Sequence, residues 1–306
     1  MNLSVVIVSY NTRDLLDACL ASVTSTMGSA SNYEVIVVDN ASLDGSAAMV
    51  KETFRQANLI VNQENRGFAA ANNQAIERSS GRHVILLNPD TVVREGALNA
   101  MVKFLEDNPE VGVVGPKLVF PDGSFQHSAF SFPTLLMIFI DFFPLNHRVL
   151  NSRLNGRYPR SLYDAGDPFP IDHPLGAGLM VRREVLEEVG LLDERFFMYC
   201  EEIDWCMRIK RAGWEIFCLP EAEIVHHVGQ STKQFHSDMF VELHKSRCRL
   251  YAKHYSRSFQ RMAHLLVALG VAYRSMRDRW AFWRGSVEQD ALNERLDAYH
   301  RIRSLS

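Results

Sequence analysis

The stretch that decides the fold is Leu3-Ser4-Val5-Val6-Ile7-Val8-Ser9-Tyr10, near the start of a chain of 306 residues. It is almost entirely apolar and rich in β-branched residues, which is typical of a strand covered on both faces of a sheet. A helical pattern follows it, and strand and helix patterns then alternate to about residue 115. This alternation predicts an α/β fold, with a mostly parallel central sheet and helices on both faces.

Polar residues follow three of the predicted strands, at residues 3–10, 34–38 and 83–87, at the point where each strand ends. These residues are Asn11, Asp39-Asn40 and Asn88-Pro89-Asp90. In open α/β sheets, ligands bind beyond the carboxyl ends of the strands. The sequence therefore predicts one shared site at this edge of the sheet.

The rest of the pattern supplies the remaining elements. Helices are predicted at residues 12–26, 45–56, 67–79, 95–106 and 183–188, and strands at 111–114, 178–181, 216–218 and 224–226. Turn residues at Pro121-Asp122-Gly123-Ser124 predict a hairpin that joins residues 117–120 to 125–127. The pattern fades from 128 to 174, as in a long functional loop or lid. We expect one domain at residues 1–232 and a helical extension at 233–306.

Charge is distributed unevenly between these two parts. Residues 233–306 hold 14 Lys and Arg against 7 Asp and Glu, whereas residues 1–232 hold 19 against 29. A basic extension predicts contact with an anionic surface. No apolar run reaches the roughly 18–20 residues of a membrane span, and no signal-peptide pattern is visible. The five cysteines are scattered and odd in number, which indicates reduced thiols rather than a disulfide framework. The prediction is a cytoplasmic protein, peripheral on the inner face of the cell membrane.

The segment Glu201-Glu202-Ile203-Asp204 follows an aromatic stretch and begins a predicted helix. A helix N-terminus favours negative charge, so these carboxylates are expected to stay ionised. An ionised carboxylate beside a pocket can take a proton from a hydroxyl, although simple helix capping is the alternative. Asp204 and Arg208 are four residues apart and predict a helical ion pair, which makes Asp204 structural.

Three further motifs complete the pattern: Asn65-Arg66-Gly67-Phe68 with Asn72, Gly176-Ala177-Gly178, and His226-His227-Val228-Gly229-Gln230-Ser231-Thr232. Together with the strand-end residues and the acidic segment, they span residues 3–232. The ordered set resembles the inverting family 2 glycosyltransferases of the GT-A fold. The resemblance is closest to the rhamnosyltransferase-like branch that builds bacterial surface polysaccharide.

The resemblance implies where a nucleotide-sugar donor binds. The implied donor-binding residues are Ser9, Asn11, Asp39, Asn65, Arg66, Asn88, Asp90, Gly176, Ala177 and Gly178. Asp39 would contact the nucleobase, Arg66 a phosphate, and residues 176–178 the sugar. Each has a structural alternative: an Asx turn at Asp39, a surface Arg66, and a plain turn at 176–178.

The resemblance also implies a divalent cation, Mg²⁺ or Mn²⁺, with Asp90 and His226 as its ligands. Asn88-Pro89-Asp90 stands where the family usually carries Asp-x-Asp. Asp90 offers the hard oxygen that such cations prefer, whereas Asn88 offers only a neutral carbonyl oxygen. His226 aligns with the family pattern His-x-x-Gly-x-Ser through Gly229 and Ser231. An Asn-Pro turn and a structural histidine are the alternatives.

The acidic segment aligns with the family's Glu-Asp-x-Asp, whose second residue takes the proton from the acceptor. Glu202 is therefore the predicted base, and Glu201 completes the predicted catalytic pair. The implied reaction is inverting transfer of a sugar, with dTDP-L-rhamnose as the suggested donor. The implied acceptor is a hydroxyl of a saccharide, lipid-linked, in bacterial surface polysaccharide synthesis.

Two other classes of protein compete with this interpretation. The single acid in Asn88-Pro89-Asp90 argues for a catalytically degenerate GT-A fold that acts as a nucleotide-sugar or glycan binding or scaffold protein. A nucleotidyltransferase or a dinucleotide-binding fold would need a Gly-rich loop after the first strand, where Ser9-Tyr10-Asn11-Thr12 stands instead. We expect no nucleic-acid partner, and a homo-oligomer stays open.

Overall fold

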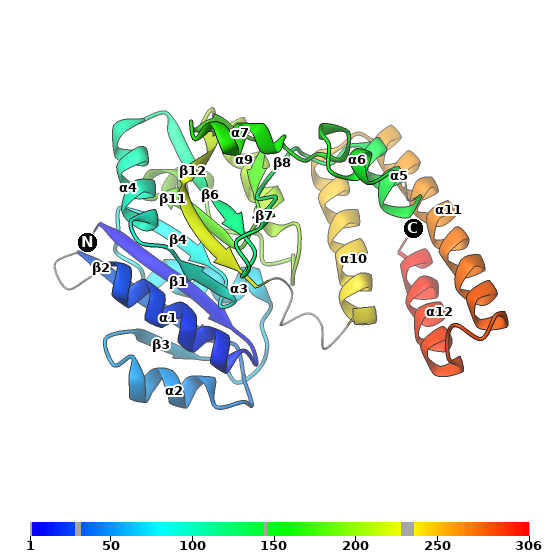
Figure 1. Ribbon diagram of the computed structural model, residues 1–306, viewed down its shortest axis with the longest axis horizontal. Coiled ribbons are helices and arrows are strands. Elements are labelled where there is room, and N and C mark those ends of the chain that lie inside the picture. Colours follow the sequence, from blue (N-terminus) through cyan, green and yellow to red (C-terminus); the bar gives the residue numbers. More distant parts are fainter. Residues whose placement is uncertain (1, 28–31, 144–145, 228–235, 306) are drawn as a thin grey trace. The chain divides into compact units, whose positions relative to one another are not determined.

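The computed structural model describes residues 2–27, 32–143, 146–227 and 236–305. The chain packs into two compact units (Figure 1). Unit 1 comprises Met1–Ser131, Tyr158–Phe197 and Glu201–Ser231, and unit 2 comprises Phe132–Arg157, Met198–Cys200 and Thr232–Ser306. The predicted domain boundary after residue 232 lies outside the described residues and stays a prediction.

A ten-stranded sheet forms the centre of unit 1. Eight strands lie in the order β3-β2-β1-β4-β11-β6-β12-β5, with β7 paired to β6 and β9 to β12. Their bounds are β1 Leu3–Ser9, β2 Tyr33–Asp39, β3 Asn58–Val61, β4 His83–Leu87, β5 Thr91–Val93, β6 Val111–Val119, β7 Phe125–Gln126, β9 Phe169–Pro170, β11 Gly178–Arg182 and β12 Glu215–His226. The neighbours β3, β2, β1 and β4 are all parallel, as are β6 and β12. The α/β prediction is confirmed, and β11 enters the sheet antiparallel to β4 and β6.

The register of the parallel strands aligns their carboxyl ends. Ser9 pairs with Asp39, and Ile7 pairs with Leu87, the last residue of β4. The polar residues that follow β1, β2 and β4 therefore meet at one edge of the sheet, as the sequence predicts.

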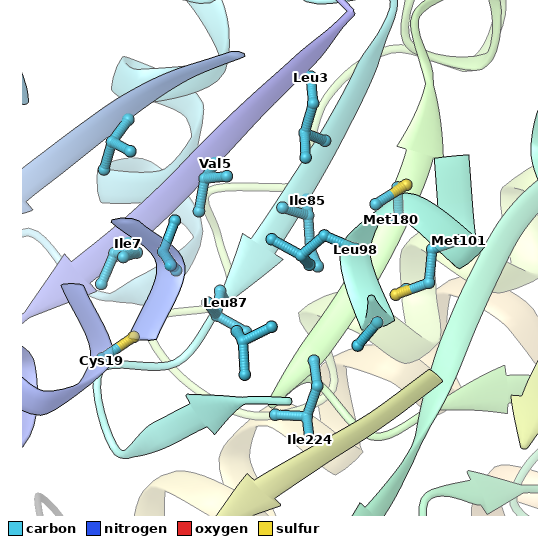
Figure 2. Close-up of a cluster of buried hydrophobic side chains, with 14 of the residues drawn as sticks. Leu3, Val5, Ile7, Cys19, Ile85, Leu87, Leu98, Met101, Met180 and Ile224 are labelled. Atoms are coloured by element: carbon cyan, nitrogen blue, oxygen red, sulfur yellow. The ribbon is translucent and has the colours of Figure 1, made fainter. Parts of the chain in front are cut away.

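Helices cover both faces of this sheet. Side chains of α1 (Arg13–Met27), α2 (Ser46–Thr53) and α4 (Ala97–Asp107) join Leu3, Val5 and Ile7 of β1 in one buried core. Figure 2 shows part of this core, where Cys19 and Leu98 approach the strands from two of these helices. Alternate residues of a strand face opposite ways, so the other face of β1 is left to α3 (Phe68–Arg78), which contacts β1 and β2. The remaining helices of unit 1 are α7 (Arg160–Ala165), α8 (Arg183–Val189) and α9 (Glu201–Arg211).

Three features of the sheet differ from the predicted elements. The two short strands expected at residues 216–218 and 224–226 are one long strand, β12, whose register shifts between Leu219 and Glu223. That irregularity accommodates Pro220, which cannot donate a ladder hydrogen bond. The short strands β3 and β5 were not predicted. The hairpin is confirmed, because β7 pairs antiparallel with β6.

Unit 2 is helical. It contains α5 (Leu135–Phe142), α6 (His147–Leu150), the 3-10 helix η1 (Arg153–Asn155), α10 (His236–His254), α11 (Arg257–Trp283) and α12 (Gln289–Arg303). Phe142 of α5 is buried with side chains of α10, α11 and α12, and a Cβ at Gly270 of α11 would overlap its ring. The helical C-terminal part is thus confirmed.

The predicted loop at residues 128–174 is largely ordered. It holds α5 to α7, β9, and the small antiparallel pair β8 (Ala129–Phe130) and β10 (His173–Pro174). Among the helices of the described residues, none is both long and apolar enough to cross a membrane.

Candidate active site

Asp39 ends β2 with one carboxylate oxygen engaged and the other open. The side chain is 2% exposed. Its Oδ2 accepts a hydrogen bond from the backbone N–H of Ser42 at 3.1 Å, three residues on and thus one residue beyond the reach of the Asx turn expected as the structural alternative. Its Oδ1 is buried without a hydrogen-bond partner in the part of the chain that the structure describes. Because buried carboxylate oxygens are normally paired, Oδ1 is suited to accept a hydrogen bond from a ligand.

Ser9 and Asn11 hold the loop after β1 against the loop after β2. The hydroxyls of Ser9 and Thr12 lie 3.0 Å apart. The Oδ1 of Asn11 accepts from the backbone N–H of Leu43 at 2.8 Å, and the backbone N–H of Asn11 donates to Ser42 Oγ at 3.0 Å. Asn11 adopts a left-handed φ of 52°, a conformation that Asn tolerates better than most residues. Asn11 therefore joins the two loops, and the Ser9 side chain braces the loop after β1.

Asn40 organises the segment that contains Asn65 and Arg66, and sequence reasoning gave it no role. Its Nδ2 donates to Asn65 Oδ1 at 2.7 Å, while its Oδ1 accepts from Asn62 Nδ2 at 3.0 Å and from the backbone N–H of Arg66 at 3.1 Å. Asn65 Oδ1 also accepts from the N–H of Gly67 at 3.0 Å. The network fixes the backbone around Arg66, whose side chain is exposed. It leaves the guanidinium available for a phosphate.

Asp90 and His226 are brought together at the start of β5 and the end of β12. Asp90 Oδ1 and His226 Nε2 are 3.4 Å apart, and both side chains are buried. The atoms are not aligned for a hydrogen bond, and Asp90 Oδ1 has no such partner in the described ranges. The backbone N–H of His227 donates to the carbonyl of Asp90 at 2.9 Å, so strand pairing fixes both residues.

Gln126 is a site residue that the sequence did not reveal. Its side-chain amide lies 3.0 Å from Nδ1 of His226, and its Oε1 is buried without a partner among the described residues. One orientation of this amide donates N–H to Nδ1. The opposite orientation places Oε1 there as an acceptor, which favours the tautomer with its proton on Nδ1 and leaves the lone pair of Nε2 facing Asp90. The second orientation is the one that a metal-ligating histidine requires.

These residues fit a divalent cation bound together with a diphosphate. Ligands at about 2.1 Å from one cation lie about 3 Å apart when they are neighbours, close to the separation of Asp90 Oδ1 and His226 Nε2. Mg²⁺ and similar ions often take only one or two protein ligands beside substrate phosphates. No cluster of three or more His, Cys, Asp or Glu side chains that could hold a metal occurs within the described residues. The remaining ligands of the cation would thus come from the side chain of Asn88, from the donor's phosphates and from water.

The predicted sugar-lining turn links the strand ends to the acidic helix. The backbone N–H of Asn88 donates to the carbonyl of Ala177 at 3.0 Å. On the other side of the turn, a Cβ at Gly176 would lie 3.7 Å from Cγ of Glu202. Gly178 begins β11 and pairs with Leu87 of β4. The predicted cation, sugar and base residues are therefore contiguous in unit 1.

Glu201 and Glu202 occupy the first turn of α9, and their ionisation differs from expectation. Burial raises the pKa of Glu202 to about 7, although backbone N–H groups of Glu202 and Ile203 lower it. Burial and then the charge of Glu202 raise the pKa of Glu201 well above its usual range. The expectation that both stay ionised is corrected, because loss of hydration outweighs the helix terminus. One oxygen of each carboxylate, Oε2, is buried and lacks a hydrogen-bond partner in the described chain.

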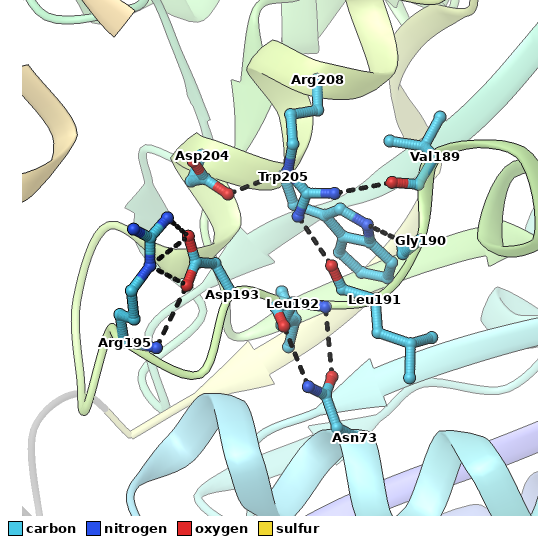
Figure 3. A network of polar contacts seen from close by, with 10 residues as sticks. All are labelled: Asn73, Val189, Gly190, Leu191, Leu192, Asp193, Arg195, Asp204, Trp205 and Arg208. Carbon is cyan, nitrogen blue, oxygen red and sulfur yellow. Dashed lines mark hydrogen bonds and ion pairs between the residues drawn. The ribbon is translucent and has the colours of Figure 1, made fainter. Parts of the chain in front are cut away.

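Asp204 belongs to the scaffold of α9, as predicted. It is fully buried and forms an ion pair with Arg208 at 3.0 Å. The other guanidinium nitrogens of Arg208 donate to the backbone carbonyls of Val189 and Leu191. Figure 3 shows this network together with Trp205, which donates to Gly190. Asn73 of α3 holds the same loop through reciprocal hydrogen bonds with the backbone of Leu192. The loop that leads toward the acidic pair is thereby fixed from both sides.

The residues Gly229 and Ser231, which carried the predicted histidine motif, lie outside the described residues.

Non-glycine residues with positive φ in the described chain are Asn11, Ala41, Tyr199 and Cys200. They follow β1 and β2 and directly precede α9. Strained backbone of this kind concentrates at functional sites.

A mostly parallel sheet with helices on both faces, followed by C-terminal helices, has the architecture of GT-A glycosyltransferases. The model of Glycosyl transferase family 2 matches residues 4–190, and the chain belongs to this family. It is an inverting glycosyltransferase, since inversion is characteristic of family 2. The enzyme prediction is confirmed over the scaffold alternative.

Its relatives place it in the rhamnosyltransferase branch, as predicted. The chain is 29% identical over 260 residues to the N-acetylglucosaminyl-diphospho-decaprenol L-rhamnosyltransferase of Mycobacterium tuberculosis, covering 80% of this chain and 82% of the relative. It is 26% identical over 239 residues to the dTDP-rhamnosyl transferase RfbF of Shigella flexneri, covering 76% and 71%. The mannosyltransferase PcManGT of Pyrobaculum calidifontis, solved with GDP-Man and Mn²⁺, has a TM-score of 0.58 at 20% identity, covering 97% of this chain and 73% of that chain. This last likeness confirms the GT-A fold.

Proposed function

We propose that the enzyme transfers L-rhamnose from dTDP-L-rhamnose to a hydroxyl of a lipid-linked saccharide during synthesis of a bacterial surface polysaccharide. The observation that carries the assignment of the site is a set of buried carboxylate oxygens, on Asp39, Asp90 and Glu202, that have no hydrogen-bond partner among the described residues. Such oxygens are costly unless a ligand satisfies them. The donor and acceptor classes are supported by the names of the two rhamnosyltransferase relatives.

The unpartnered carboxylate oxygens and the Arg66 guanidinium each have a chemical role in this proposal. Asp39 Oδ1 accepts a hydrogen bond from the imide N–H of the thymine base. Arg66 pairs with the diphosphate, for which a guanidinium has matching geometry. Glu202 takes the proton from the acceptor hydroxyl as that oxygen attacks the anomeric carbon from the face opposite the leaving dTDP. A base with a pKa near the working pH suits this task.

Asp90 and His226 would hold the divalent cation, Mg²⁺ or Mn²⁺, beside the diphosphate. When bound, that cation supplies charge neutralisation for the leaving group. The chain's own contribution is to hold Asp90 Oδ1 and His226 Nε2 at 3.4 Å from each other, while Arg66 would supply a guanidinium for the diphosphate. Asn88, with a neutral amide in place of a second carboxylate, reduces the negative charge at this site. Such a site would hold the cation weakly in the absence of nucleotide.

A thermal-shift panel of nucleotides and nucleotide sugars, with and without Mg²⁺ or Mn²⁺, tests the donor. We expect dTDP and dTDP-L-rhamnose to raise Tm more than UDP, GDP and their sugars, and the rise to be larger when the cation is present. Asp90→Ala should abolish transfer and remove the cation-dependent part of the shift, since Asp90 is the sole carboxylate of its turn. Full activity in Asp90→Ala would refute the cation site, and a preference for UDP or GDP would refute the donor.

The acceptor and location form the second half of the proposal. We infer that the protein works at the cytoplasmic face of the cell membrane, where a lipid-linked saccharide is accessible. Incubation with dTDP-L-rhamnose and either an N-acetylglucosaminyl diphosphate on a polyprenyl chain or the free sugar separates the possibilities. We expect product only on the lipid-linked form. Equal transfer to the free sugar would remove the lipid from the proposal. A homo-oligomer remains a prediction for sedimentation analysis.

A further inference from the structure

The longest helix of unit 2 carries an apolar face that the described residues of this unit leave exposed. We define the α11 stripe as Met262, Leu265, Leu269, Met276, Trp280 and Trp283, all of them exposed. Their separations of 3, 4, 7, 4 and 3 residues keep them on one side of a helix. The buried residues of α11, among them Gly270 and Val271, lie on the opposite side and pack into the unit 2 core. The stripe therefore does not serve the folding of this unit.

The stripe has the composition of a membrane-interface surface. Trp280 and Trp283 are 54% and 80% exposed, and Leu265 and Leu269 are 52% and 53% exposed. Large apolar side chains in a continuous exposed row are uncommon on a protein that meets only water. Tryptophan is favoured where one side of the ring meets hydrocarbon and the other meets water.

Exposed apolar residues of α5 continue this surface. Phe139, which is 37% exposed, stacks on Phe143 with ring centroids 4.7 Å apart. Phe143 in turn contacts Tyr273 of α11 at 5.4 Å. Tyr273 lies beside the stripe, four residues from Leu269 and three from Met276. The apolar surface thus spans two helices that pack together within unit 2.

The charges beside the stripe select what it can bind. Arg261 and Arg279 are exposed and lie 18 residues apart, which is five turns, so both border the same edge of the stripe. Arg284 lies over the ring of Trp280 at 4.6 Å. The sole acid of α11 is Asp278, which is buried and receives a hydrogen bond from Tyr299 at 2.8 Å. The exposed side of the helix is therefore apolar and cationic, with no exposed carboxylate.

We propose that the α11 stripe docks unit 2 onto an anionic lipid surface, with α11 lying in the interface. An amphipathic helix with arginines beside the apolar face and tryptophans on it binds in this way. A second copy of the chain is a poorer occupant, because two such helices related by a two-fold axis would set arginines against arginines. The proposal does not depend on the acceptor proposed above, because lipid binding requires neither donor nor acceptor.

Vesicle flotation of the full-length protein tests the proposal. We expect it to float with vesicles that contain phosphatidylglycerol, to bind phosphatidylcholine vesicles far less, and to detach progressively as salt is raised. Leu265→Glu with Leu269→Glu should lower the bound fraction at least about tenfold, since charges placed in the stripe oppose insertion. Arg261→Gln with Arg279→Gln should weaken binding and flatten the salt dependence.

Val61→Glu is the matched control, because Val61 is an apolar residue of unit 1 with a similar exposure of 57%. It should float as the wild type does. Both Glu variants change exposed positions, so unchanged circular dichroism and Tm would show that they fold. Failure of the wild type to bind anionic vesicles at low salt would overturn the proposal, as would normal flotation of the Leu265/Leu269 variant. A wild-type dimer that this variant converts to a monomer, without vesicle binding, would identify the second copy as the occupant instead.

Discussion

At the scale of single residues, the acidic pair of α9 sets the sharpest test. We predict that Glu202→Gln keeps donor binding but lowers turnover at least about a hundredfold, the usual scale for loss of a general base. Gln has the shape of Glu without its basicity, so dTDP affinity should stay within about twofold. Steady-state kinetics and calorimetric titration of dTDP measure the two quantities separately.

The pH profile of the same enzyme gives an independent check. The base acts only when ionised, and burial raises the pKa of Glu202 to about 7. The wild-type rate should therefore fall as pH drops through about 7 and level off above it, and Glu202→Gln should lose this limb. Glu201→Gln is the control, which should remain active because Glu202 keeps its carboxylate. A large loss of turnover in Glu201→Gln, together with normal turnover in Glu202→Gln, would show that Glu201 is the base instead.

Gln126 supplies a second residue-scale prediction. Gln126→Leu should weaken cation-dependent dTDP binding about 10- to 100-fold, the usual cost of losing a partner behind a metal ligand. Binding without the cation should be unchanged, because Gln126 contacts His226 and no nucleotide-facing residue. Gln126→Glu keeps an acceptor for Nδ1 and should restore the affinity. Equal weakening with and without the cation would mean that Gln126 acts only in packing.

At the scale of elements, the approach of α3 to the loop before α9 depends on one glycine. Gly67 has φ 82° and ψ 171°, a region open essentially only to glycine. A Cβ there would stand 2.5 Å from the carbonyl oxygen of Phe197, which accepts from the N–H of Phe68 at 2.7 Å. We predict that Gly67→Ala lowers the free energy of unfolding by at least about 3 kcal/mol and weakens nucleotide binding.

Gly96→Ala is the matched control for that prediction. Gly96 also has a positive φ, 78°, but a Cβ there would meet nothing within 4 Å. Its cost should be limited to about 1–2 kcal/mol of backbone strain. Denaturant unfolding of both variants measures the difference. Equal losses would show that the contact with Phe197 carries no energy of its own.

The elements also show what a sequence can reveal. β1, β2 and β4 were predictable because each is a continuous apolar run, and the strand rule then placed Asp39 and Asp90 at one edge. β5 has three residues and exists through pairing with β12, more than a hundred residues later. Local pattern carries no sign of such a strand.

Side-chain networks were hidden for the same reason. Gln126 meets His226 across 100 residues of chain, and Asn40 meets Asn65 across 25. Contacts between residues this far apart in the chain form no local sequence motif, so neither contact could be predicted from the sequence. The ionisation of Glu202 was mispredicted because it depends on burial, which the helix-terminus argument does not include.

At the scale of the whole molecule, the chain passes between its two units several times. Residues 132–157 and 198–200 group with the C-terminal helices, although they lie inside the region expected to be one domain. Phe142 is 2% exposed because α10, α11 and α12 surround it. The charge asymmetry in the sequence pointed to the C-terminal part of unit 2. Residues 132–157, which supply Phe142 to its core, fall within the predicted loop of the first domain, so the sequence did not group them with it.

This arrangement predicts that a chain ending after residue 232 does not behave as an independent domain. Removal of α10 to α12 would uncover the buried Phe142 of α5, because the buried side chains that cluster with it belong to these three helices. At about 1.5–3 kcal/mol for each large apolar side chain returned to water, the exposed helix should drive association. We expect the 1–232 fragment to aggregate or bind a hydrophobic dye in size-exclusion and fluorescence assays. The fragment that also carries Phe142→Ser should be more soluble, because a serine at this position no longer needs the missing helices to cover it. A monodisperse 1–232 fragment that melts cooperatively and binds dTDP would instead show that unit 1 tolerates an uncovered α5.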